Sequence, residues 1–124
     1  MSFRVLTDFP IDPTSADLKE PLRPSPENPS KFALSALNLF RRPIRVLDLG
    51  CGENALILAF YELGSSGIGL DIKGIGLSRG DRGSYPPKTP QIRVLCDFSQ
   101  PFRVINASGD RVRFDLITSW EAFE

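Results

Sequence analysis

One short segment of this chain combines the residue types that bind a nucleoside-containing cofactor. Gly50, Cys51 and Gly52 follow the apolar run 44–49, and a strongly helix-forming segment, 55–63, begins shortly after them. Two glycines allow a sharp turn and a close approach of the backbone. The helix that follows presents free N–H groups and the positive end of its dipole. This order predicts a loop that binds a phosphate or a carboxylate.

Acidic side chains stand where the neighbouring strands are expected to end. Asp71 closes the segment 67–71, at about 20 residues from the first glycine, where a carboxylate can accept hydrogen bonds from both hydroxyls of a ribose. Asp48 lies two residues before Gly50, and Asp97 follows another apolar segment. Strand, glycine turn, helix, strand and acid in this order predict a nucleoside-containing cofactor.

The residues alone leave open which cofactor it is. Gly50-x-Gly52-x-x-Ala55 satisfies the dinucleotide fingerprint in its alanine variant, which favours a nicotinamide cofactor. A purely structural interpretation also stands, since two glycines can simply form a tight turn and Asp48 can accept hydrogen bonds from nearby backbone N–H groups.

The elements that position these residues alternate between strand and helix. A helix is expected over 55–63, closed by Gly64. Strands are expected over 44–49, 67–71, 92–96 and 114–119. This arrangement predicts an α/β fold, a three-layer Rossmann-like parallel sheet with strand order 3-2-1-4.

The connections between the later strands are poor in helix-forming residues. Glycines and prolines recur through 72–91, so at most one or two helical turns are expected there. The connection 98–113 is expected to be short and irregular, because it contains Pro101, Asn106 and Gly109.

The first 43 residues differ in composition from the rest, since they hold seven of the 11 prolines and no glycine. They are expected to form an extended proline-rich arm and one leading helix, with Ser30 as its N-cap and Pro43 after its end. We therefore divide the chain into 1–43, arm and leading helix, and 44–124, the cofactor-binding part.

Composition excludes several kinds of chemistry. The chain has 124 residues, 15 basic and 15 acidic side chains and no histidine. A Ser-His-Asp triad, a Cys-His pair and a histidine-ligated metal are excluded within it, and no metal site is predicted. Nucleic-acid-binding domains usually carry an excess of positive charge. The net charge of this chain is zero, so no nucleic-acid partner is indicated. Two cysteines are too few for a disulfide framework.

The start of the chain has no uninterrupted apolar region before Asp8 and Pro10, and no apolar run is long enough to span a bilayer. We therefore expect a cytoplasmic protein without membrane contact.

Three segments resemble the class I S-adenosylmethionine (SAM)-dependent methyltransferases: 46–52 (VLDLGCG), 69–71 (GLD) and 114–121 (FDLITSWE). Asp48, two residues before the first glycine, is typical of that family and unusual in nicotinamide dehydrogenases. Asn54 stands where many members have a third glycine, and asparagine tolerates left-handed backbone. The resemblance implies SAM as the cofactor and methyl transfer as the reaction, an in-line displacement that needs no covalent nucleophile.

The resemblance also implies roles for single residues. Gly50 and Gly52 would let the backbone approach the methionine part of SAM, and Asp48 would shape that pocket. Asp71 would hold the ribose diol. The other implied cofactor contacts are Cys51, Ile72 at the adenine ring, Asp97 at the adenine amino group, Phe98, and Trp120, which lies with Ser119 and Glu121 near the sulfonium. No catalytic residue is assigned.

The family's sheet has three further strands after the fourth, so 44–124 is expected to be the N-terminal half of such a domain, with the fourth strand as an edge open to self-association. Two alternatives remain: an NAD-dependent oxidoreductase fragment, and a truncated, non-catalytic binding module. The methyl acceptor, and whether the 124-residue chain is active alone, are not specified by any motif.

Overall fold

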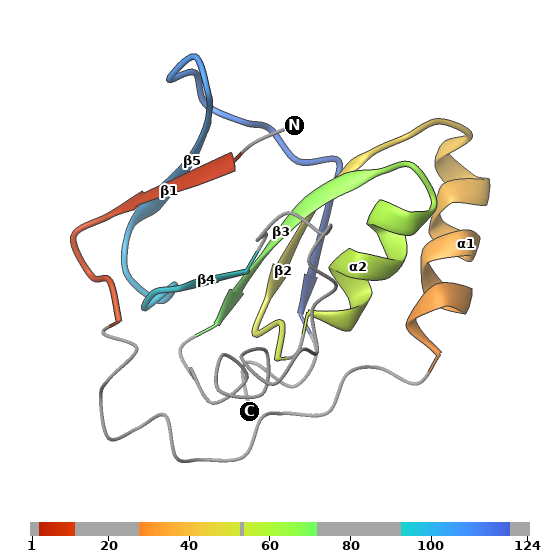
Figure 1. Cartoon of the computed structure of the whole chain (residues 1–124), viewed down its shortest axis with the longest axis horizontal. Coiled ribbons are helices and arrows are strands. Elements are labelled where there is room, and N and C mark those ends of the chain that lie inside the picture. The colour runs from red at the N-terminus through yellow and green to blue at the C-terminus, as the bar shows by residue number, and fades with distance from the viewer. Residues whose placement is uncertain (1–2, 12–27, 53, 72–92, 120–124) are drawn as a thin grey trace.

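The computed structural model describes residues 3–11, 28–52, 54–71 and 93–119 (Figure 1). In chain order its elements are β1 (Phe3–Thr7), α1 (Pro29–Phe40), β2 (Arg45–Leu49), α2 (Ala55–Glu62), β3 (Ser66–Asp71), β4 (Arg93–Leu95), β5 (Phe102–Asn106) and β6 (Leu116–Ser119).

The central element is a four-stranded sheet in the order β4-β3-β2-β6. Every neighbouring pair in it is parallel. The predicted α/β architecture with a parallel sheet is confirmed. Parallel strands end at the same edge of a sheet, and Asp48 and Asp71 both lie at or near the carboxyl ends of their strands.

Both described helices cover one face of this sheet (Figure 1). Their apolar side chains form a core with Val46 of β2 and Leu116 of β6, and the rings of Phe32 on α1 and Phe60 on α2 pack edge to face. The buried members of this cluster are Ala33, Ile44, Val46, Leu56, Ile57, Ala59 and Phe60. Neither helix in the described ranges is long and apolar enough to cross a membrane.

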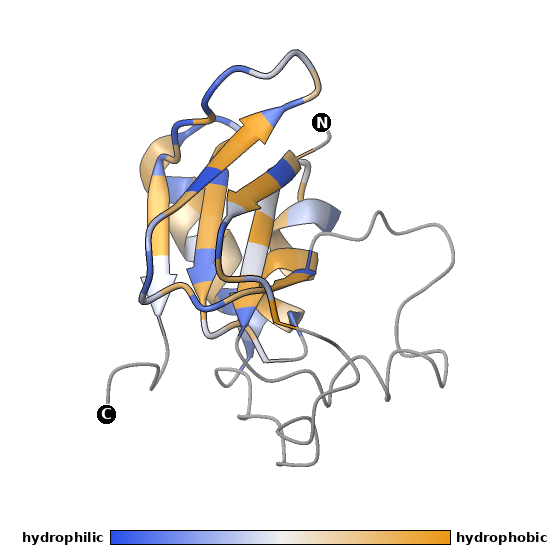
Figure 2. Ribbon diagram, turned by 90° about the vertical axis from the view of Figure 1, so that its left-hand side faces the viewer, coloured by the Kyte–Doolittle hydropathy of each residue, from blue (hydrophilic) through white to orange (hydrophobic). Residues whose placement is uncertain are grey.

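An antiparallel two-stranded ribbon, β1 with β5, covers the opposite face of the sheet (Figure 2). Its inward side chains, among them Val5 and Val104, pack on Leu47 of β2 and on Ile68 and Leu70 of β3. The third layer of the described structure is therefore a β-ribbon.

The ribbon corrects two expectations. Residues 3–7 belong to the folded core rather than to an extended arm, and the connection 98–113 contains the strand β5. The physical reason is that a parallel sheet with apolar side chains on both faces must be covered on both. The first three residues of each strand, Phe3-Arg4-Val5 and Phe102-Arg103-Val104, alternate between apolar and charged, as in a half-buried ribbon.

Helix α1 begins two residues earlier than predicted. Its N-cap is Asn28, whose Oδ1 accepts a hydrogen bond from the backbone N–H of Lys31 at 3.1 Å, so the prediction of Ser30 as the cap is wrong. Pro29 then occupies the first helical turn, where its missing N–H costs nothing. At the other end, Arg41 adopts a left-handed conformation and its N–H donates to the carbonyl of Leu37 at 2.8 Å. The second predicted helix is confirmed as α2, with Gly64 at positive φ after its end.

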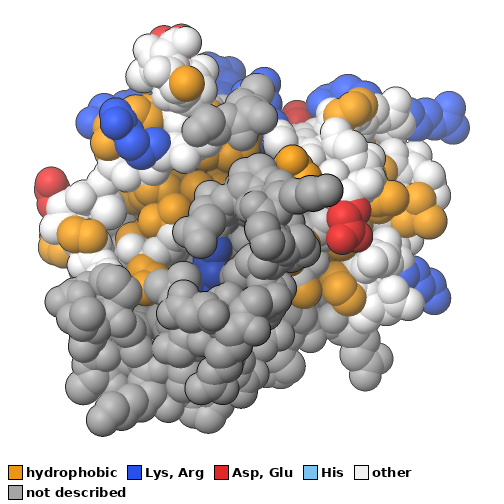
Figure 3. Space-filling view, in the orientation of Figure 1, with side chains coloured by type: hydrophobic (Ala, Val, Ile, Leu, Met, Phe, Trp, Pro, Cys, Tyr) orange, Lys and Arg blue, Asp and Glu red, His pale blue; other side chains and the backbone are white. Residues whose placement is uncertain are grey.

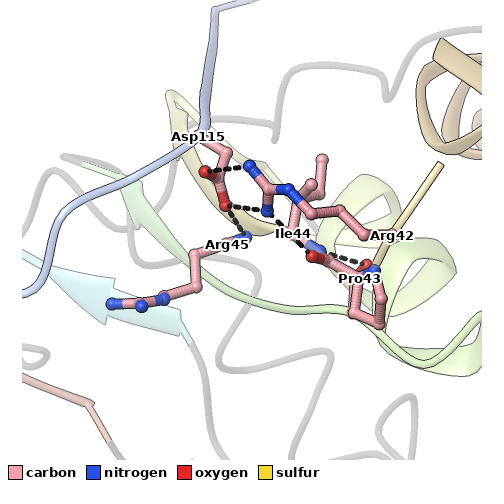
Figure 4. A network of polar contacts seen from close by, with 6 residues as sticks. Arg42, Pro43, Ile44, Arg45 and Asp115 are labelled. Atoms are coloured by element: carbon pink, nitrogen blue, oxygen red, sulfur yellow. Dashed lines mark hydrogen bonds and ion pairs between the residues drawn. The ribbon is translucent and has the colours of Figure 1, made fainter. Parts of the chain in front are cut away.

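An ion pair fastens the starts of β2 and β6 to the end of α1 (Figure 4). The carboxylate of Asp115 accepts hydrogen bonds from both terminal nitrogens of Arg42, at 2.9 and 3.3 Å, and from the backbone N–H of Arg45 at 2.9 Å. These donors lower the pKa of Asp115 to about 2. Three segments far apart in the sequence thus meet at one carboxylate.

We expect Asp115→Asn to lower the melting temperature at pH 7 by a few degrees, since it removes the ion pair and weakens the acceptor for Arg45. A carboxyl whose pKa is lowered on folding stabilises the fold above its unfolded pKa. The difference from the parent chain should therefore shrink as the pH falls from about 4 towards about 2. Thermal denaturation followed by circular dichroism over this range measures it.

Asp110→Asn is the matched control, because Asp110 is exposed and its carboxylate forms no hydrogen bond or ion pair among the described residues. A loss of stability equal to that of Asp115→Asn, or one that does not change with pH, would contradict the role given to Asp115.

Candidate functional site

The glycine loop between β2 and α2 is attached to the neighbouring strand β3. Gly50 and Gly52 adopt positive φ angles of 76° and 56°, which glycine adopts without steric cost. The backbone N–H groups of Gly50 and Cys51 both donate to the carbonyl of Leu70, at 2.8 and 3.1 Å. The loop therefore turns back over the carboxyl end of β3, and the predicted sharp turn is confirmed.

Asn54 starts helix α2 in a left-handed conformation with a φ of 66°. This confirms the expectation that asparagine can replace a glycine at this point of the loop. Its side chain is fully buried, and it makes no capping hydrogen bond to the helix. The first N–H groups of α2 therefore receive no acceptor from the Asn54 side chain.

Gly69 of β3 leaves the space into which the loop folds. A Cβ atom at this position would lie 2.1 Å from Oδ1 of Asn54 and 2.6 and 2.7 Å from Cβ and Sγ of Cys51. No real Cβ makes contacts this short, so only glycine fits without a shift of the loop. The sequence signal for this role was the glycine inside a strand, which typically indicates close backbone approach.

Asp71 joins the loop to the end of β3. One of its carboxylate oxygens, Oδ2, accepts a hydrogen bond from the backbone N–H of Gly52 at 2.6 Å, and the residue is only 5% exposed. The predicted ribose-binding acid and the second glycine of the loop are therefore in direct contact.

Arg93, the first residue of β4, completes this cluster and was missed by the sequence reasoning. Its Nε donates to the carbonyl of Gly52 at 2.6 Å, and its Nη2 lies 3.8 Å from Oδ2 of Asp71. The side chain is buried, and arginine side chains are seldom buried unless their charge is paired. The signal available in the sequence was a lone arginine within the apolar segment 92–96.

Asp48 lies beneath the loop and is almost fully buried. It sits in register with Thr118 of β6, whose hydroxyl donates to Oδ1 of Asp48 at 2.9 Å. Burial raises the pKa of Asp48 to about 6, and the nearby charge of Asp71 adds to this, although the Thr118 hydrogen bond opposes it. Thr118 is a second site residue that the sequence reasoning did not identify.

Asp97 and Phe98 follow the end of β4 and have other contacts. Oδ1 of Asp97 accepts hydrogen bonds from the backbone N–H and the hydroxyl of Ser99, and its own N–H donates to the carbonyl of Phe9 at 3.0 Å. Phe98 packs against the core beneath the ribbon. Asp97 is thus held in a local turn, at the same edge of the sheet as the glycine loop.

Both cysteines are buried and unsuited to act as nucleophiles. Burial raises the pKa of the Cys51 thiol far above its usual range, and burial followed by the charge of Asp97 raises that of Cys96 to about 11. The Cys51 side chain lies against Gly69, so the residue can offer a ligand only its backbone.

The structure thus brings Asp48, Gly50, Gly52 and Asp71 together at the carboxyl edge of the sheet. Such an edge, next to a glycine loop and a helix N-terminus, is where open α/β sheets bind ligands. Ile72 and Trp120 lie outside the described residues.

Comparison with known proteins identifies one family. A family model described as a methyltransferase domain matches residues 24–124, which is most of the chain. Neither the curated proteins nor the solved structures contain a significant match. The family to which the motifs pointed is therefore confirmed.

We expect Gly69→Ala to destabilise the chain by about 1–3 kcal/mol, the usual cost of overpacking, because the new methyl group overlaps Asn54 and Cys51. Urea unfolding measures this loss. The double variant Gly69→Ala/Asn54→Gly removes the closest clash and keeps a residue suited to positive φ, so it should recover part of the stability. A double variant less stable than Gly69→Ala, after the effect of Asn54→Gly alone is subtracted, would refute the steric account.

Asp48 predicts a pH dependence of stability. Its pKa is higher in the folded chain, so its contribution is most favourable below about 4 and is lost as the pH rises through about 6. Asp48→Asn keeps an acceptor for Thr118 and cannot ionise. Its free energy of unfolding, relative to the parent chain, should therefore increase by about 2 kcal/mol between pH 4 and 7. A constant difference across this range, measured by urea unfolding at each pH, would contradict the burial of a titrating carboxyl.

Proposed function

This chain belongs to the family of methyltransferase domains, and we propose that it transfers a methyl group from SAM to an acceptor. The observation that supports this most directly is the contact between Gly52 and Asp71. It joins the loop that would approach the methionine part of the cofactor to the acid that would hold its ribose.

The charge of the site agrees with a cationic ligand. SAM carries positive charge at its sulfonium and amino groups, and two buried carboxylates, Asp48 and Asp71, lie beside the loop with one buried cation, Arg93. A cation that binds near Asp48 would favour its ionised form and offset the burial that raises its pKa. The donor set of the site therefore fits SAM.

Each residue then has a definite task. A ligand can come close to the backbone of Gly50 and Gly52, because neither residue has a side chain. An ionised carboxylate has about four acceptor positions, so Asp71 can hold Gly52 and accept hydrogen bonds from ribose hydroxyls as well. The cofactor, when bound, supplies the activated methyl group. The chain's own contribution is binding and orientation, which account for much of the catalysis of an in-line displacement.

An NAD-dependent oxidoreductase is the second candidate, favoured by the spacing Gly50-x-Gly52-x-x-Ala55. The buried acid Asp48 argues against it, since it would face a pyrophosphate with a further negative charge. A binding module without catalysis is the third candidate, and it shares the SAM site with our proposal.

Isothermal titration of the full chain with SAM, S-adenosylhomocysteine and NAD separates these candidates. We expect SAM and S-adenosylhomocysteine to bind and NAD not to bind. Asp71→Asn should weaken SAM binding by about tenfold or more, because hydrogen bonds to a charged group contribute about 1.5–3 kcal/mol. Asp110→Asn, which removes the same charge from an exposed hairpin, should leave the affinity unchanged.

Binding of NAD without binding of SAM by the parent chain would overturn the proposal, even if Asp71→Asn fails to fold. SAM binding without methyl transfer to any of a panel of protein, nucleic-acid and small-molecule acceptors would favour the binding module instead.

A further inference from the structure

The outward face of the β1–β5 ribbon carries arginines that methyl transfer does not use. Arg4 on β1 and Arg103 on β5 each alternate with side chains that pack into the core beneath the ribbon. Since successive side chains of a strand point to opposite faces, both arginines point away from the core. The alternating core residues are Phe3, Val5, Phe102 and Val104.

A third segment adds two more arginines to this face. Residues 111–113 run beside β5, since Arg111 bridges to Ile105 and the N–H of Val112 donates to the carbonyl of Val104 at 2.9 Å. Val112 packs into the core, so Arg111 and Arg113 on either side of it point outward. We call Arg4, Arg103, Arg111 and Arg113 the arginine face.

The hairpin between β5 and this segment is firmly built. Oδ1 of Asn106 accepts hydrogen bonds from the N–H groups of Ser108 and Asp110, both at 3.0 Å, and Gly109 takes a positive φ of 85°. The N–H of Asn106 donates to the carbonyl of Asp110 at 2.9 Å, which closes the turn. These bonds fix the backbone that connects β5 to residues 111–113.

The charge of the arginine face is not neutralised within the described part of the chain. All four side chains are exposed, and none takes part in an ion pair there. The other outward positions of the ribbon, Leu6 and Ile105, are apolar. Figure 2 looks onto this face, where hydrophilic bands alternate with hydrophobic ones along the front strands. In Figure 3, basic side chains gather at the upper left, where Figure 1 places β1 and β5.

We propose that the arginine face binds a nucleic acid through its backbone phosphates. Guanidinium groups match the geometry of phosphate oxygens and pair with them in bidentate fashion. Interfaces with nucleic acids are polar and strongly positive, whereas the centres of protein interfaces are more apolar and poor in charge. Of the two apolar side chains on this face, Ile105 is buried and Leu6 is exposed, so four exposed arginines stand against one exposed apolar side chain.

A hollow at one end of the arginine face provides a place for a phosphate. It has a volume of about 360 Å³ and both Arg103 and Arg111 line it, together with Leu6, Thr7, Asp8, Pro101 and Phe102. Asp8 is the one acid in this lining and would oppose an anion. Contacts between arginines and phosphates carry no information about base sequence, so binding here is expected to be independent of sequence.

The test uses the full chain and a fluorescein-labelled oligonucleotide of mixed sequence, as single-stranded DNA and as a duplex, in fluorescence anisotropy without SAM. We expect binding that weakens with salt, and Arg103→Gln/Arg111→Gln should lower the affinity about tenfold. Each arginine removed should reduce the slope of log affinity against log salt by about 0.7 for the single strand and about 0.9 for the duplex. The two probes thus identify which form binds.

Two further variants sharpen the result. Asp8→Asn removes the opposing carboxylate from the hollow, so it should strengthen binding. Lys31→Gln/Arg41→Gln removes two exposed positive charges from α1 and its C-cap, on the other side of the parallel sheet, and should leave binding unchanged. Melting curves of all variants establish that they are folded.

The proposal is overturned if neither probe binds at low salt, or if the α1 variant weakens binding as much as the arginine-face variant. It is also overturned if polyglutamate displaces the oligonucleotide at equal charge concentration, which would indicate an acidic protein partner. Because no cofactor is present, the outcome is independent of whether the chain transfers methyl groups.

Discussion

The absence of a side chain at residue 69 is the constraint on which the site depends. Because Gly69 has no Cβ, Cys51 and Asn54 can lie directly against β3. The loop then comes close enough for Gly50 and Cys51 to donate to the carbonyl of Leu70, and for Gly52 to donate to Asp71. The same close approach fixes the start of α2. Asn54 is the N-cap of this helix, and its Oδ1 is the atom nearest to the point that a Cβ of residue 69 would occupy. The loop, the start of α2 and Asp71 are therefore positioned by one close contact between backbones.

Burial of charge is the second feature that shapes the site. Asp48, Asp71 and Arg93 are each less than a tenth exposed, and burying ions costs free energy unless they are paired. Arg93 lies beside Asp71, whereas burial, with a smaller contribution from the charge of Asp71, raises the pKa of Asp48 to about 6. The site can thus adjust its charge by one proton at Asp48. A cation bound beside Asp48 would favour its ionised form, whereas a bound anion would add to the repulsion.

The part of the fold that the sequence predicts best is the part with the strongest local patterns. β2, β3 and α2 follow from short segments rich in apolar residues, with glycines after β2 and α2, and the loop follows from the glycines themselves. Arg93 and Thr118 could not be predicted as site residues, because their roles depend on which strands lie side by side. β1 was missed for a related reason: its five residues form a strand only by pairing with β5, which lies almost the whole length of the chain away. Long-range pairing leaves no local signal beyond the alternation of residue types.

That alternation also explains how a chain of zero net charge separates its charges in space. The two middle strands of the parallel sheet, β2 and β3, are covered on both faces, so their interior positions hold mainly apolar residues and glycine, with buried carboxylates at or near their carboxyl ends. The ribbon packs on the sheet with one face alone, so charged side chains can occupy its other face. Arg4 and Arg103 lie there beside Leu6 and Ile105, while the buried carboxylates lie at the edge of the central sheet. The net charge of zero therefore conceals an exposed group of arginines and a buried pair of carboxylates, which lie in different layers of the fold.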